Sequence, residues 1–196
     1  MKLINSAKFT AVLDANVLYP VVIRDFLMRL STNEVYTPKW TQKLMDEFSS
    51  IFKKKGLSYP EDKIRRQVEL MNIANPEAMV EKYESLLPAI KLPDENDRHV
   101  VAAAIKSNSN VIVTYNLKDF PSEYLDSLGL EAIDPDNFIA DMIDLTPDKC
   151  CDAFKKTVYS KRNPPYTEEE YLDIFRNVGL IQTADELEKY LDISSS

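Results

Sequence analysis

Short apolar runs alternate with helical patterns along the first part of the chain. Phe9–Leu13 predicts a buried strand, and Val21–Leu30 predicts an apolar helix that follows it. Val35–Tyr36, Val111–Val113 and Glu131–Ile133 predict three further strands. Strands that alternate with helices are typical of a parallel sheet flanked by helices, so the pattern predicts an α/β fold.

Helical patterns with N-cap or proline starts fill the other segments between these strands. We expect these helices at Thr41 to Gly56, Glu61–Ile73, Pro76–Leu86, from about Asp94, and from Asp134-Pro135 to about Ile143. Trp40, just before the first of them, is interpreted as a packing residue.

The chain changes character after Ile143. Residues 141–196 carry 12 acids and 7 bases, a net charge of −5. Pro147 opens a first helix, Thr167 with Glu170 predicts a capping box for a second, and Thr183 with Glu186 predicts one for a third. Their apolar positions need burial against another body: Phe154, Val158, Leu172, Phe175, Leu187 and Leu191. We therefore predict a main domain over residues 1–143 and a C-terminal helical accessory region over 144–196.

Three acids occupy positions where an apolar side chain is expected. Asp97 shares a helix face with Val100, Val101 and Ala104. Glu47 lies within an apolar stripe while its neighbour Asp46 points elsewhere, and Asp14 ends the first predicted strand. A carboxylate directed inward must be satisfied by a hydrogen bond, a cation or a metal. The spacing thus suggests a site for a hard cation.

The predicted sheet supports this interpretation. Ligand sites in such sheets gather beyond the carboxyl ends of the strands, where Asp14 lies and where Thr114, Asn116 and Asp119 follow another strand. Oxygen ligands without a Cys/His cluster point to Mg²⁺ or Mn²⁺ and away from zinc. Such a site could activate a water molecule and neutralise the charge of a phosphodiester transition state.

Each of these residues also has a purely structural interpretation. Asp14 could cap the next helix, Asp97 could be an acid stabilised by the dipole at a helix N-terminus, and Glu47 could pair with an arginine. Asn116 and Asp119 could be turn residues. Their joint placement favours a shared site. The single histidine, His99, is expected to face away from it, because two helical positions correspond to a rotation of roughly 200°.

Composition and charge exclude several classes of protein. No apolar run approaches the roughly 18 residues of a membrane span, and the two adjacent cysteines are interpreted as reduced packing residues, so we expect a cytoplasmic protein. No P-loop and no Gly-x-Ser-x-Gly motif are present. The net charge of −8 argues against a general nucleic-acid coat protein. Two local basic stretches remain, Lys53–Arg66, and Lys155–Arg162 without a nearby acid; each is more typical of a solvated helix face than of a nucleic-acid contact.

Four motifs, in order along the chain, resemble the PIN domain, specifically the VapC-type toxin ribonucleases. They are DANVLYP (Asp14–Pro20), DEF (Asp46–Phe48), DRHVVAAA (Asp97–Ala104) and VTYNLKDFP (Val113–Pro121). The resemblance covers roughly Phe9 to Ile143 and is nearest to a subgroup with an extra C-terminal helical region. It implies a PIN-like fold and a Mg²⁺- or Mn²⁺-dependent endoribonuclease. It also implies a cognate antitoxin as partner and often a homodimer.

The resemblance also assigns roles to residues of this chain. The family's first three acids match Asp14, Glu47 and Asp97; the fourth position offers both Asn116 and Asp119, of which Asp119 supplies a charge. Thr114 matches the residue that orients the first acid, and Asn16 and Asn116 are expected to support the site. RNA contacts are expected from local basic residues: Lys53, Lys54, Lys55, Arg65 and Arg66. Two alternatives stay open, an RNA-processing PIN nuclease without an antitoxin and a catalytically weak PIN binding module.

Overall fold

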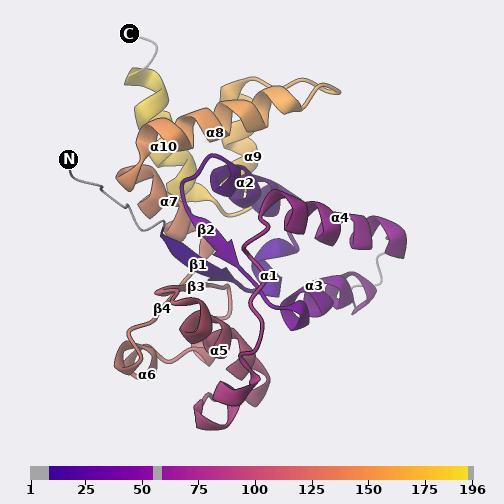
Figure 1. Cartoon of the computed structure of the whole chain (residues 1–196). Helices are drawn as coiled ribbons and strands as arrows, with labels where there is room; N and C mark the ends of the chain where they lie inside the picture. The colour runs from indigo at the N-terminus through magenta and orange to yellow at the C-terminus, as the bar shows by residue number, and fades with distance from the viewer. Residues whose placement is uncertain (1–8, 55–58, 194–196) are drawn as a thin grey trace, which may run out of the picture.

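The computed structural model describes residues 9–54 and 59–193, and a parallel sheet lies at its centre (Figure 1). The strand order is β2-β1-β3-β4, and every neighbouring pair is parallel. The strands are β1 (Thr10–Leu13), β2 (Thr37–Lys39), β3 (Val111–Val113) and β4 (Glu131–Ile133). The predicted α/β fold with a helix-flanked parallel sheet is therefore confirmed.

Helices surround this sheet. The α-helices are α1 (Ala15–Leu18), α2 (Val21–Thr32), α3 (Gln42–Lys54), α4 (Glu61–Ala74), α5 (Arg98–Ser107), α6 (Ser122–Ser127), α7 (Pro135–Leu145), α8 (Pro147–Ser160), α9 (Glu168–Asn177) and α10 (Ile181–Ile193). Three short 3₁₀ turns are η1 (Glu84–Ala89), η2 (Glu95–Asp97) and η3 (Leu117–Asp119). Figure 1 shows α5 and α6 on one side of the sheet and α7, α8 and α10 on the other.

The central strands β1 and β3 end level with each other. Leu13 is in register with Val113, and the Asp14 amide donates to the Val113 carbonyl at 3.0 Å. Both strands are apolar and almost wholly buried, as expected for strands covered on both faces. The residues that follow them, Asp14 and Thr114, are consequently held side by side at one edge of the sheet.

Two predicted elements were wrong. The second strand forms at Thr37–Lys39 and not at Val35–Tyr36: these two residues are buried, but pairing begins where the Thr37 amide donates to the Phe9 carbonyl at 2.7 Å. No α-helix forms over Pro76–Leu86. The backbone there pairs with Trp40 instead, because the Trp40 amide donates to Ala78 at 3.0 Å and the Val80 amide donates to Trp40 at 2.8 Å. Trp40 itself is fully buried, which confirms its packing role.

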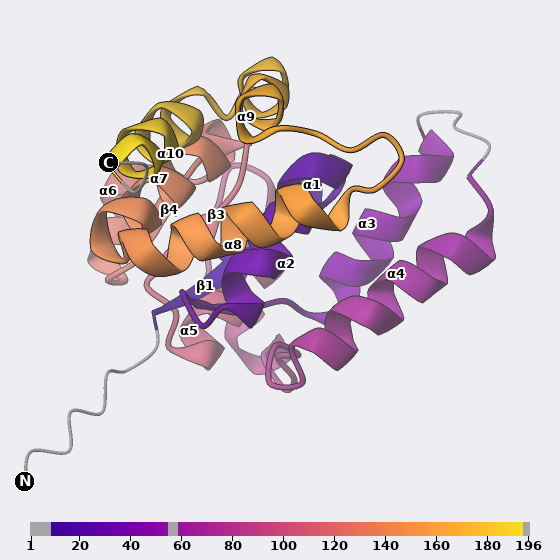
Figure 2. The same cartoon turned by 90° about the horizontal axis from the view of Figure 1, so that it is seen from above.

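The C-terminal region forms the three predicted helices, and they pack on the body of the protein. Figure 2 shows α8 lying along α2. Phe26 of α2 contacts Phe154 of α8 and Phe175 of α9, with ring centroids 6.4 and 4.9 Å apart. The six apolar residues predicted to need burial are all buried. The two cysteines are also free and buried, as predicted.

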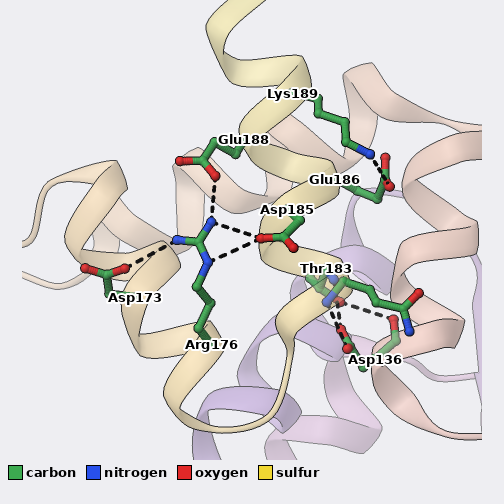
Figure 3. Close-up of polar contacts among 9 residues, drawn as sticks. Asp136, Asp173, Arg176, Thr183, Asp185, Glu186, Glu188 and Lys189 are labelled. Carbon is green, nitrogen blue, oxygen red and sulfur yellow. Dashed lines mark hydrogen bonds and ion pairs between the residues drawn. The ribbon is translucent and has the colours of Figure 1, made fainter.

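The capping box predicted for the second of these helices is confirmed, and the one predicted for the third is wrong. Thr167 and Glu170 form the capping box of α9, with bonds of 3.2 and 2.9 Å. The Thr183–Glu186 box was wrong, because α10 begins at Ile181 and Thr183 lies inside it. Asp136 of α7 caps this helix from outside: its carboxylate accepts from the Gln182 amide at 2.9 Å and from the Thr183 amide at 2.8 Å (Figure 3).

Arg176 fastens α9 to α10. Its guanidinium contacts Asp185 at 3.1 Å and Glu188 at 2.6 Å, both on α10, and Asp173 on its own helix at 3.3 Å (Figure 3). Together with Asp136, this cluster fixes the last helix at both its start and its middle. Within the described residues, no helix combines the length and the apolar character needed to cross a membrane.

Candidate active site

Asp14 and Thr114 form the centre of the candidate site, at the carboxyl ends of β1 and β3. The Thr114 hydroxyl donates to Asp14 Oδ2 at 2.7 Å, and Asn16 Nδ2 donates to the same oxygen at 2.7 Å. Asn16 also donates to Thr114 Oγ1 at 3.1 Å and accepts from the Tyr115 amide at 3.1 Å. The first acid is thus fixed in orientation by two neutral donors, and Asn16 links the ends of both strands.

Burial dominates the electrostatics of Asp14. Desolvation raises its pKa above the ordinary value, the bond from Thr114 lowers it, and the charge of Glu47 raises it further. No cation among the described residues forms an ion pair with Asp14. The helix-cap interpretation of this residue is not supported, because its side chain makes no capping hydrogen bond to α1.

Asn116 and Asp119 lie in the turn after β3. The Asn116 amide nitrogen donates to Thr114 Oγ1 at 3.0 Å, and its side-chain Nδ2 contacts Asp119 Oδ2 closely. Both residues are therefore turn residues and neighbours of the acid network. Asn116 holds the carboxylate of Asp119, and which of the two fills the fourth site position stays a prediction.

Asp97 carries a carboxylate that its neighbours do not fully satisfy with hydrogen bonds. Its Oδ2 is buried and, among the described residues, has no hydrogen-bond partner. Desolvation and the charges of Asp14, Asp94 and Asp119 raise its pKa to about 6, while His99 opposes this rise. Although it precedes α5, it makes no capping hydrogen bond. A helix N-terminus favours the charged form of an acid, so the raised pKa indicates that burial and the neighbouring acids outweigh any such effect on Asp97.

Glu47 of α3 contacts His99, whose charge also acts on Asp97. His99 Nε2 lies 3.1 Å from Glu47 Oε1, and Lys43 Nζ lies 3.9 Å from the same oxygen. The expectation that His99 faces away was wrong. It assumed one regular helix from about Asp94, whereas residues 95–97 form a 3₁₀ turn and α5 begins at Arg98. His99 is 2% exposed, and its contact with Glu47 has the distance of an ion pair but not the geometry of a hydrogen bond, so neither ring nitrogen has a hydrogen-bond partner among the described residues.

These donors suit a hard cation in their chemistry. The charges of Asp14 and Asp119 raise the pKa of Asp97, and Asp97 carries an unsatisfied buried oxygen, as expected where a cation would compensate negative charge. Among the described residues, however, no three Asp, Glu, His or Cys side chains form a ready-made metal-binding group. The ligand set of Asp14, Glu47, Asp97 and Asp119 therefore stays a prediction.

The predicted basic residues divide into three groups. The side chains of Lys53, Lys54 and Lys55 lie outside the described residues. Arg65 and Arg66 are exposed on α4, where Arg66 pairs with Glu69 at 3.1 Å. The second stretch does have acids nearby, contrary to expectation, since two of its lysines are paired: Lys156 with Asp152 at 2.6 Å and Lys161 with Asp25 at 3.1 Å.

Tyr115 is a residue that the sequence reasoning missed. It lies between Thr114 and Asn116, its backbone is held by Asn16, and its side chain is exposed although large and aromatic. Burial, together with the charges of Asp134 and Asp136, raises its pKa to about 12. The signal was present in the sequence, because an aromatic ring stands next to the polar residues at a strand end.

Comparisons with known proteins agree with this architecture. A family model described as "PIN domain" matches residues 10–118, more than half of the chain, and one described as "VapC50 C-terminal domain" matches residues 135–189. Over 77 residues the chain is 39% identical to "Putative ribonuclease VapC50" of Mycobacterium tuberculosis (strain ATCC 25618 / H37Rv). This match covers 39% of the chain and 46% of the relative, so the chain spans about half the length of the curated relative it matches. No solved structure matches the chain.

Proposed function

The chain belongs to the PIN domain family, and from this premise we propose that it is a Mg²⁺- or Mn²⁺-dependent endoribonuclease of the VapC type. The observation that carries the proposal is the state of two acids, Asp14 and Asp97, of which the first raises the pKa of the second by its charge. The first is oriented by Thr114 and Asn16, and the second has a buried, unpartnered carboxylate oxygen. Such an arrangement places negative charge where only a cation would compensate it.

Each site residue has a role in this proposal. Asp14, Glu47, Asp97 and Asp119 would hold the cation, which supplies neutralisation of phosphate charge and activation of water when bound. Thr114 and Asn16 keep Asp14 in one orientation, and Asn116 does the same for Asp119. His99 acts through Glu47, whose carboxylate oxygen lies 3.1 Å from its Nε2. Fixed orientation matters because loosely held ligands bind metals less well.

RNA is the substrate that best fits the surroundings of these acids. Tyr115 follows Thr114 directly and its ring is exposed, and proteins commonly bind single-stranded RNA by stacking bases on aromatic side chains. The exposed Arg65 and Arg66 on α4 would contact the phosphate backbone. The relative named as a ribonuclease supports the same substrate class.

The finer parts of the proposal concern partners and domains. We infer that the protein is the toxin of a type II toxin–antitoxin pair, is cytoplasmic, and is blocked by a cognate antitoxin. We infer further that residues 1–143 form the nuclease domain and that residues 144–196 form an accessory region. Support comes from the likeness to VapC50 in two parts of the chain. A small DNA-binding protein encoded next to this gene would favour the toxin over an RNA-processing nuclease.

Cleavage of RNA by the purified protein tests the proposal. The protein is incubated with single-stranded and hairpin RNA in Mg²⁺, in Mn²⁺ and in EDTA, and products are resolved by gel. We expect internal cleavage that EDTA abolishes and that is lost in Asp14→Asn and Asp97→Asn. Asp46→Asn is the matched control, since Asp46 is an exposed acid of α3 whose carboxylate is bonded to Gln42. Wild-type activity in either site variant would show that this acid is not a metal ligand.

A further inference from the structure

A cleft separates α2, α4 and α8, away from the acids of the candidate site. Its volume is about 400 Å³. Apolar groups such as Met28 and Leu70 form part of its wall, and the polar part includes Arg24, Arg29, Gln67, Thr157, Ser160 and Lys161. The cleft is therefore lined by polar side chains from three helices that are distant in sequence, although the hydroxyls of Thr157 and Ser160 already donate to carbonyls of α8.

Arg24 is the unusual member of this lining. Arg24 is only 5% exposed. Its Nη1 donates to the Leu18 carbonyl at 3.1 Å. The guanidinium lies 5.5 Å from the centre of the Phe48 ring, and burial lowers its pKa. It forms no ion pair with an acid among the described residues. A buried cation is normally paired, so this one has donors to spare.

The charge of the cleft is opposite to that of the chain. Three cations line it, Arg24, Arg29 and Lys161, against one acid, Asp25. Asp25 is already engaged by Lys161 at 3.1 Å. The charge of Asp25 also acts on Arg24, but one acid against three cations leaves the cleft with an excess of positive charge, in a protein whose net charge is −8. Such a local concentration of arginine suits an anion with phosphate geometry.

The same residues connect the cleft to the candidate active site. Leu18, which accepts from Arg24, ends α1, and α1 begins directly after Asp14. Phe48, which lies under the Arg24 guanidinium, follows Glu47 on α3. The buried cation thus contacts α1, which begins directly after Asp14, and α3, which carries Glu47.

We propose that this cleft is a phosphate subsite for the RNA substrate, in which Arg24 and Arg29 hold a phosphodiester of a nucleotide away from the scissile bond. This inference rests on the proposed function and adds to it a second place where the same strand is bound. Thr157 and Ser160 of α8 form part of the wall, so the accessory region shapes the subsite, while their hydroxyls donate to carbonyls of α8 itself. RNA long enough to span both places would bind better than a fragment confined to the acids.

The test compares RNA binding and cleavage in the wild type, in Arg29→Gln and in Lys106→Gln. Lys106 is an exposed cation on α5, outside the cleft, and serves as the matched control. Binding of a labelled single-stranded RNA of about 12 nucleotides is measured in EDTA by fluorescence anisotropy over a range of salt concentrations. For Arg29→Gln we expect weaker binding and a salt slope reduced by about 0.7 for the lost phosphate contact. Lys106→Gln should leave both unchanged.

Cleavage in Mg²⁺ gives a second readout. Arg29→Gln should raise KM for the long RNA with kcat unchanged, because a remote contact contributes uniform binding. It should leave cleavage of a trinucleotide unchanged, since that substrate is too short to reach the cleft. Arg24→Gln should act in the same direction and more strongly. Because Arg24 also packs on Phe48, its variant is interpreted only if its thermal unfolding matches the wild type, and Arg29→Gln carries the test alone otherwise.

The outcomes separate this inference from the proposed function. A wild-type protein that cleaves RNA while Arg29→Gln keeps the same affinity, salt slope and KM would overturn the subsite alone. A wild-type protein that neither binds nor cleaves RNA would overturn the proposed function and the subsite with it. Unchanged RNA binding in Arg29→Gln with lost binding of poly-glutamate would assign the cleft to an acidic protein segment and also overturn the proposal.

Discussion

Asp97→Asn should make the protein more stable in the absence of divalent cations, although it removes activity. The pKa of Asp97 rises from 3.8 to about 6, chiefly through burial and then through the charges of Asp14, Asp94 and Asp119. Two pKa units correspond to a ceiling of about 3 kcal/mol against the charged form. Because the carboxyl group is partly exposed, solvent screening reduces the expected gain to about 1 kcal/mol. For a chain of this size that is a rise in Tm of roughly 2–4 °C.

The dependence on pH follows from the direction of this shift. Between about pH 4 and pH 6, folded Asp97 keeps a proton that the unfolded chain has released, so wild-type stability falls as pH rises through this window. Asparagine does not titrate. The advantage of Asp97→Asn should therefore be full above about pH 6 and vanish near pH 4.

Thermal unfolding followed by circular dichroism in EDTA measures both effects, at about pH 4 and about pH 7.5. Asp46→Asn is again the control and should show no such pH-dependent gain. Added Mg²⁺ should raise the Tm of the wild type more than that of Asp97→Asn, since a ligand stabilises only the state that binds it. A lower Tm for Asp97→Asn than for wild type in EDTA at the higher pH, or an equal rise in Tm at both pH values, would refute the prediction. Either result would show that the folded protein does not disfavour the charged form of Asp97.

Three further predictions concern neighbouring residues. Thr114→Val should lower cleavage by about 10–100-fold, because Asp14 loses the donor that orients it, while Thr114→Ser should retain most activity; rates at saturating RNA decide this. Tyr115→Ala should weaken RNA binding by about 1–3 kcal/mol and Tyr115→Phe should not, as measured by anisotropy in EDTA; equal losses in both would exclude stacking. Asp136→Ala should cost about 0.5–2 kcal/mol of stability by uncapping α10, with faster hydrogen exchange at Gln182 and Thr183; unchanged exchange there would contradict the capping role.

The sequence alone determined the order of elements and the polar residues at the strand ends. Periodicity located most of the helices, and local chemistry located their starts, as at Thr167, whose capping partner Glu170 is three residues away. Both signals act over one or two helical turns, so they are readable without a fold. The parallel α/β arrangement followed from alternation, and it placed Asp14 and Thr114 at one edge before any contact was known.

Tertiary structure decided whatever depends on a partner far along the chain. Asp136 caps α10 from more than 40 positions away, so no local pattern marks it, and the nearby Thr183–Glu186 pair looked like the cap instead. His99 turned toward Glu47 because a 3₁₀ turn precedes α5. The raised pKa of Asp97 likewise arises from burial and from charges on other elements. Capping, helix rotation and desolvation depend on distances in space, and spacing along the sequence does not fix those distances until the chain has folded.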